Sequence, residues 1–85
     1  MDRHEFAQRA QRLPDMFAAR LTADDLEDVR DAIRAGEWDV GLSNLVAALS
    51  QTAAPITAHE RAELAALLDA IGEPAVRLDA LRVQG

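Results

Sequence analysis

Apolar residues recur every three or four positions along most of the chain, which is the spacing of one face of an α-helix. The first apolar stripe consists of Phe6, Ala10, Leu13 and Phe17. Pro14 interrupts this stripe, and a proline both lacks an N–H donor and pushes the preceding residue away from helical angles. We therefore expect a helix over residues 3–12, followed by a kink or a restart that runs from Pro14 to about residue 20.

Capping residues and a glycine delimit the next two helices. Thr22 precedes Asp25 by three positions, which is close to a capping box, and Gly36 is typical of the residue just beyond a helix end. Between them the apolar stripe is Leu26, Val29 and Ile33. A third helix is expected to begin near Glu37 and to bury Trp38, Leu42, Leu45 and Leu49 on one face.

The C-terminal third repeats these signals. Thr57 with Glu60 is a capping box that starts a fourth helix, and Gly72 ends it. Pro74 suits the first turn of a short last helix, which would hold Val76, Leu78 and Leu81. No segment alternates with period two for long enough to predict a strand. The sequence therefore predicts an all-α fold, a compact bundle of four to five short helices that forms a single domain over residues 1–85.

Composition narrows the class of protein. Hydrophobic residues make up 49% of the 85 positions, so the chain is not of the disordered type, and the absence of cysteine excludes disulfides and thiolate chemistry. We see no apolar run as long as a signal peptide or a membrane span, so we expect a cytoplasmic protein.

Candidate catalytic and ligand-binding residues are sparse. His4 and His59 are isolated, and neither Ser43 nor Ser50 lies in a nucleophile motif. No glycine-rich loop could hold a phosphate. We therefore expect no catalytic residues, no cofactor and no metal site, and a protein that is not an enzyme.

Charge is the most informative feature of this chain. Residues 21–39 hold seven acidic side chains and two arginines, a net charge of −5, against −1 for all the other residues together. Helix N-termini account for some of these acids. Asp28 and Asp31 are different, because they stand beyond the first turn and form with Asp24 a stripe of like charges that points away from the core.

Two interpretations of the stripe remain open: an ordinary solvated face, or a docking surface for a positively charged protein. Nucleic acid and anionic membrane are poor partners for such a field. Trp38 is also open to two interpretations, because it could anchor the core or contribute to an interface between the exposed neighbours Glu37 and Asp39.

Two longer segments resemble the MafI-type immunity proteins of bacterial polymorphic toxin systems. They read DLEDVRDAIRAGEWDVGLSNLVAAL and PITAHERAELAALLDAIG, and the match covers about residues 25–72. The matching positions are Ile33, Gly36 and Glu37 at a helix end, Leu42 and Leu45 in a core stripe, and Pro55, Ile56, Thr57 and Glu60 around a capping box. These motifs are mainly structural.

The chain also departs from that family. Gly41 stands where the family usually has alanine, which should weaken the third helix by up to about 1 kcal/mol. The loop SQTAA before Pro55 lacks the acidic and aromatic residues of many relatives.

The resemblance implies a small cytoplasmic antitoxin that binds and occludes a cognate toxin domain with a basic surface, such as a nuclease. The distribution of charge agrees with this function, and from it we expect Asp24, Asp28, Asp31, Glu37 and Asp39 at the interface, with Trp38 as a candidate apolar anchor. Two alternatives stay open: a non-catalytic homodimer or adaptor module, and a degenerate acyl-carrier-like protein. The last is the weaker one, because Asn44 in GLSNL occupies the place of the serine that would carry the phosphopantetheine arm.

Overall fold

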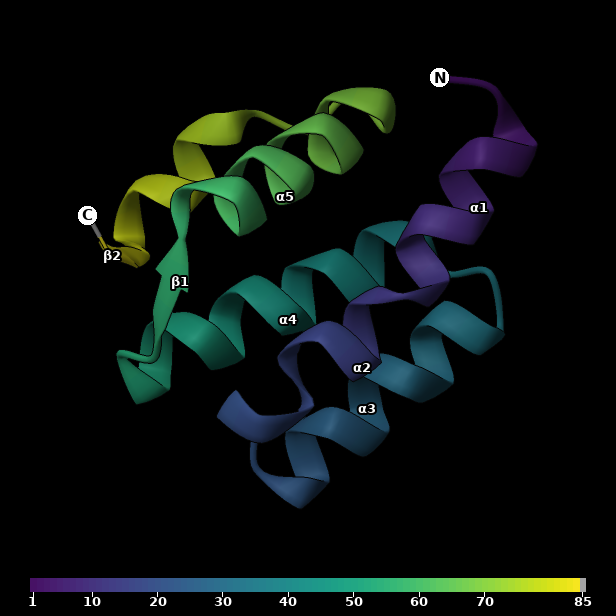
Figure 1. Ribbon diagram of the computed structural model, residues 1–85. Coiled ribbons are helices and arrows are strands. Elements are labelled where there is room, and N and C mark those ends of the chain that lie inside the picture. The colour runs from purple at the N-terminus through teal and green to yellow at the C-terminus, as the bar shows by residue number, and fades with distance from the viewer. Residues whose placement is uncertain (85) are drawn as a thin grey trace.

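Pro14 divides the N-terminal stripe into two helices in the computed structural model, which describes residues 1–84 (Figure 1). Helix α1 spans Arg3–Gln11 and α2 spans Leu13–Phe17, continued by the 3₁₀ turn η1 over Ala18–Arg20. Pro14 lies in the first turn of α2, where a helix has no use for the missing N–H. The chain therefore restarts at this proline instead of kinking. Only Gly85 of the expected domain lies outside the described residues.

Helices α3 (Ala23–Arg34) and α4 (Trp38–Thr52) form a hairpin. The Thr22 hydroxyl accepts a hydrogen bond from the Asp25 N–H at 3.1 Å, which confirms the predicted N-cap. Gly36 has a φ of 75°, and this left-handed angle lets the Glu37 N–H reach the Ala32 carbonyl at 2.9 Å. The glycine thus ends α3 and turns the chain directly into α4.

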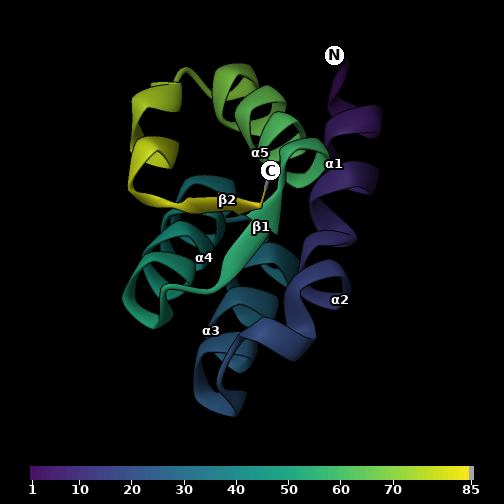
Figure 2. The same cartoon turned by 60° about the vertical axis from the view of Figure 1, so that its left-hand side comes forward.

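The C-terminal third contains two short strands that the sequence did not predict. The chain continues through β1 (Pro55–Thr57), α5 (Ala58–Ala70), the 3₁₀ segment η2 (Ala75–Ala80) and β2 (Arg82–Gln84). Strands β1 and β2 pair in parallel, with Ile56 opposite Val83 (Figure 2). Three residues are too few to show alternation, so the prediction of no strand was wrong. The predicted last helix was also wrong in type, because η2 is 3₁₀ and ends before Leu81.

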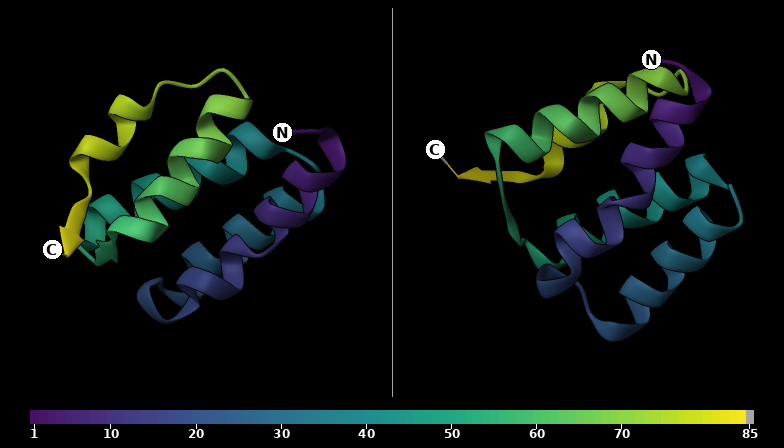
Figure 3. Two further views of the ribbon diagram at one scale, coloured as in Figure 1. Left: turned by 45° about the horizontal axis from the view of Figure 1, so that its top comes forward. Right: turned by 45° about the vertical axis from the view of Figure 1, so that its right-hand side comes forward.

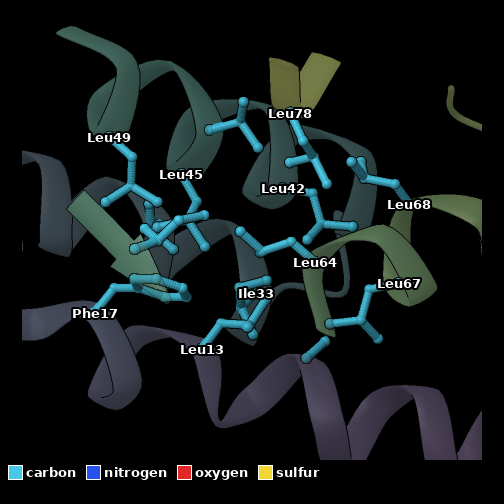
Figure 4. Packing of buried hydrophobic residues seen from close by; sticks show 14 of the residues in the cluster. Leu13, Phe17, Ile33, Leu42, Leu45, Leu49, Leu64, Leu67, Leu68 and Leu78 are labelled. Carbon is cyan, nitrogen blue, oxygen red and sulfur yellow. The ribbon is translucent and has the colours of Figure 1, made fainter. Parts of the chain in front are cut away.

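The predicted all-α fold is confirmed, since the strands form only this minimal pair. Helix α4 lies between α3 and α5 (Figures 1 and 3). Figure 4 shows side chains of α4 and α5 pointing toward one another and toward side chains of α2 and α3. The largest fully buried ones are Phe17, Leu13, Leu42, Leu45, Leu49, Ile56, Leu64, Leu67, Leu68, Leu78 and Val29. No polar or charged residue among residues 1–84 is buried.

Two arginine–glutamate pairs fasten α5 to the N-terminal helices. Arg9 of α1 binds both carboxylate oxygens of Glu63. Arg20 donates to both oxygens of Glu60 at 2.7 and 2.5 Å, and also to the backbone carbonyls of Pro55 and Met16. Glu60 in addition accepts the Thr57 N–H at 2.8 Å and so completes the predicted capping box. These bonds lower the pKa of Glu60 to about 2, with the Arg20 guanidinium as the main cause.

Gly41 allows α3 and α4 to approach closely. A Cβ placed on this buried residue would lie 2.7 Å from Cδ1 and 3.1 Å from Cγ1 of Ile33. The glycine therefore has a packing role here, and its cost to helix propensity is offset by contact between the two helices.

We expect the Arg20–Glu60 pair to make the fold acid-sensitive. A carboxylate whose folded-state pKa is depressed stabilises the fold above its unfolded pKa of about 4.5, and this contribution is lost as the pH falls toward about 2. Glu60→Gln should lower the free energy of unfolding at neutral pH by about 1–3 kcal/mol. The difference in unfolding free energy between this variant and the wild type should shrink as the pH falls from about 4.5 to about 2. Urea unfolding followed by circular dichroism measures both. Arg20→Met must also flatten this pH dependence, and an unchanged slope would contradict the assignment.

The contact between Gly41 and Ile33 predicts a non-additive pair of substitutions. Gly41→Ala alone should destabilise the fold by up to about 2 kcal/mol, because the overpacking against Ile33, about 1–3 kcal/mol, outweighs the gain in helix propensity of up to about 1 kcal/mol. Ile33→Val removes Cδ1, so Gly41→Ala should cost at least about 0.5 kcal/mol less in that background. Thermal unfolding of the four proteins gives the coupling energy. Additive effects would mean that Ile33 does not limit the packing at Gly41.

Candidate functional site

The acidic stripe of α3 is a solvent-facing surface. Asp24, Asp28 and Asp31 are all exposed, whereas Val29 and Ile33 of the same helix are buried, so the predicted orientation of the stripe is confirmed. Asp31 lies 4.0 Å from Arg34, at the outer limit of an ion pair. Asp24 and Asp28 form no ion pair within residues 1–84. Most of the negative charge of the stripe therefore remains available to a partner.

The two arginines of α3 lie along its other edge. Arg30 donates to the Asp15 carboxylate of α2 at 2.9 Å. Arg30 and Arg34 border a surface depression together with Gln11 and Pro14, which belong to the N-terminal helices. Their spacing of four residues puts them on one side of α3. Arg30 and Arg34 thus lie toward α2, and Asp25 and Asp28 lie on the opposite edge, whereas Asp31 lies beside the two arginines in a second surface depression.

The aspartate edge of α3 faces α4. Asp25 and Asp28 line a small groove of about 170 Å³ with Asn44, Gln51 and two alanines of α4. Asp25 is half-buried there and, like Asp28, has no ion pair within the described residues. The α3 side of the groove therefore carries carboxylates, and the α4 side carries two side-chain amides and two alanines.

The outer surface of α4 beside this groove is uncharged. Four exposed residues follow one another at intervals of four, three and four positions, and we call them the α4 shelf: Val40, Asn44, Ala47 and Gln51. This spacing places them along one line of the helix. Asp39 is the only charged residue in all fifteen positions of α4. The shelf was not predicted from the sequence, although its residues repeat the spacing of the buried apolar stripe of α4, shifted by two positions.

Glu37 and Asp39 do not lie on the same surface as the shelf. Glu37 is the N-cap residue of α4 and is exposed in the turn after α3. Asp39 is four and eleven residues before Ser43 and Ser50, which border a depression against Arg77 of η2. Asp39 therefore lies on the same side of α4 as these two serines, about 140° around the helix from Asn44. The six residues predicted for the interface therefore do not form one surface. Three lie on α3, Glu37 lies in the turn, and Trp38 and Asp39 lie on sides of α4 that do not carry the shelf.

Trp38 packs partly on the core and partly faces a surface hollow. Its ring meets Phe6 edge to face, with centroids 5.4 Å apart and an interplanar angle of 80°. It also lines a groove of about 430 Å³ with Ala7, Ala70 and Ile71. Both interpretations of Trp38 thus keep a structural basis, since the ring contributes to packing and remains reachable from solvent.

The described residues contain no cluster of three or more histidine or acidic side chains that could hold a metal ion. None of their helices has the length and the apolar composition that a membrane crossing needs. No family model matches this chain, and no curated protein and no solved structure proved significantly similar to it.

We expect the aspartate stripe to oppose folding slightly. Asp28 lies three or four residues from Asp24, Asp25 and Asp31, and each like-charge pair costs a few tenths of a kcal/mol. Asp28→Asn should therefore raise the free energy of unfolding by about 0.3–0.8 kcal/mol, and added salt should reduce the gain. Urea unfolding at low and high ionic strength measures both effects. The control Asp15→Asn, which removes the partner of Arg30, should have the opposite sign, and a loss of stability in Asp28→Asn would show that the stripe supports the fold.

Proposed function

We propose that this chain is an immunity protein, an antitoxin that binds a toxin domain with a basic surface and neutralises it by occlusion. The observation that carries the proposal is that Asp24 and Asp28 of α3 are exposed and form no ion pair within residues 1–84, while most of the ion-paired arginines lie outside α3. The resemblance of residues 25–72 to MafI-type immunity proteins supports the same function.

Occlusion needs no catalysis from this chain. A toxin that acts on a polyanion such as nucleic acid must present positive charge to its substrate, and an acidic face of matching size competes for that surface. Long-range attraction also accelerates the encounter, which matters when a newly made toxin must be captured before it acts. We therefore place the protein in the cytoplasm of the bacterium that produces the toxin.

Co-expression tests this function directly. The protein should restore growth to bacteria that express the toxin-like open reading frame beside its gene, and the two proteins should co-purify. The absence of rescue by the wild-type chain would overturn the proposal. A self-associating protein that does not bind this product would instead support the homodimer alternative, which light scattering detects.

The electrostatic basis of binding predicts a second result. Replacing Asp24, Asp28 and Asp31 by asparagine should weaken binding of the same product by about 10–100-fold, mainly through slower association, and should reduce its salt dependence. Surface plasmon resonance gives both rates. The matched control Glu5→Gln with Asp69→Asn and Asp79→Asn removes three charges from α1, α5 and η2 and should change affinity by less than about threefold. Equal losses in the two triple variants would mean that only net charge matters.

A further inference from the structure

The α4 shelf is an unpartnered helix face beside a charged wall. Val40, Asn44, Ala47 and Gln51 are exposed, and none of them carries a charge. In contrast, the neighbouring α3 presents its unpaired carboxylates on the edge that faces the shelf, since Asp25 and Asp28 border the same groove as Asn44 and Gln51. On an ordinary solvated surface, charged residues are spread evenly, whereas here an uncharged strip lies next to a row of acids. The centres of protein interfaces are likewise depleted of charged residues.

The dimensions of the molecule place both features under one footprint. The chain measures 30 × 25 × 17 Å. A standard interface covers about 800 Å² of each partner, which is most of one face of a protein of this size. A partner bound to the acids of α3 would therefore also cover the shelf, and the shelf must fit its surface.

We propose that the α3–α4 face is the docking site for a basic amphipathic helix of the toxin domain, lying along the groove between the two helices. This inference rests on the proposed immunity function and assigns its contact surface. The arginine or lysine side chains of that helix face Asp25 and Asp28, and its small or apolar side chains cover Ala47 and Val40. A helix suits the site because the shelf runs along α4 for about 16 Å, from the 11 steps between Val40 and Gln51 at about 1.5 Å each, which is about three turns of a helix.

Charge complementarity selects this partner. A second copy of the chain would bring its own acidic α3 to the same face, and like charges placed opposite each other across an interface repel. An acidic or purely apolar helix would leave the half-buried Asp25 without a counter-charge, which is costly once water is excluded. The side-chain amides of Asn44 and Gln51 can each donate and accept hydrogen bonds, so they help to orient the bound helix. Because they are uncharged, the partner must still be basic.

A substitution in the middle of the shelf tests this assignment. Ala47→Arg adds bulk and a positive charge at an exposed helical position, and arginine is a good helix former, so the fold should be retained. Binding of the purified product of the neighbouring toxin-like gene should weaken by at least about 100-fold, because steric overlap and like-charge repulsion act together. The matched control is Ala62→Arg, the same change at an exposed alanine of α5, with an expected effect below about threefold.

The wild-type chain and the control distinguish the two levels of the proposal. If the wild type does not bind the neighbouring product, the proposed function fails. If the wild type and Ala47→Arg bind equally well, the function stands and the assigned surface is wrong. If instead the wild type dimerises without the toxin and Ala47→Arg abolishes the dimer, the shelf binds a second copy and the basic-helix assignment is overturned. A selective loss in Ala47→Arg, with circular dichroism unchanged, supports it.

Discussion

The placement of nine arginines determines where the negative potential of this protein remains. The chain has fifteen acidic residues, so every arginine that pairs on one side leaves carboxylates unbalanced on another. Arg9 and Arg20 pair with Glu63 and Glu60 of α5, and both pairs are bidentate. Bidentate pairs that are mostly shielded from water are the ion pairs most able to support a fold. These two arginines therefore compensate acids of α5 and leave the carboxylates on the outer edge of α3 without their charge.

The same two ion pairs also support a small hydrophobic core, because they connect α5 to the N-terminal segments. A domain of this size buries a modest fraction of its surface, so packing alone leaves little margin. Arg20 contributes more than one contact, since it also lies over the Phe17 ring and bonds the carbonyl of Pro55. It links η1 to the start of α5, and α5 completes the hydrophobic core above α4. The α3–α4 hairpin tolerates repulsive charge on its outer edge because its inner side is packed in the core, with Ile33 close to Gly41.

Local signals in the sequence predicted most of the helices but not the arrangement of their faces. Helix ends were predictable because they depend on a few neighbouring residues. The residues that mark them are the N-caps Thr22 and Thr57 and the glycines Gly36 and Gly72. The stretch SQTAAPIT with Pro55 indicated where α4 ends, but no glycine marks that end, and Ala53 takes the left-handed angle that glycine usually supplies. The strand pair also escaped prediction, since it joins residues far apart in the chain and each strand has only three residues.

The candidate surface was predictable only in part for the same reason. The spacing of Asp24, Asp28 and Asp31 showed their common face, which depends on one helix alone. Whether Asp39 joins them depends on which side of α4 packs against α3, and this follows from the tertiary contacts of Gly41. Asp25 looked like a helix-terminal charge in the sequence, yet its position beside Asn44 makes it part of the groove.

The most direct test of the charge arrangement is a residue-by-residue measurement of the near-surface electrostatic potential by nuclear magnetic resonance. Relaxation caused by a cationic nitroxide co-solute is compared with that caused by an anionic one at each amide. We predict the strongest preference for the cationic probe along α3 from Asp24 to Asp31 and on the adjoining face of α4, and a weaker one around the Arg20–Glu60 pair, whose charges compensate each other. An even preference over the whole surface would contradict the account.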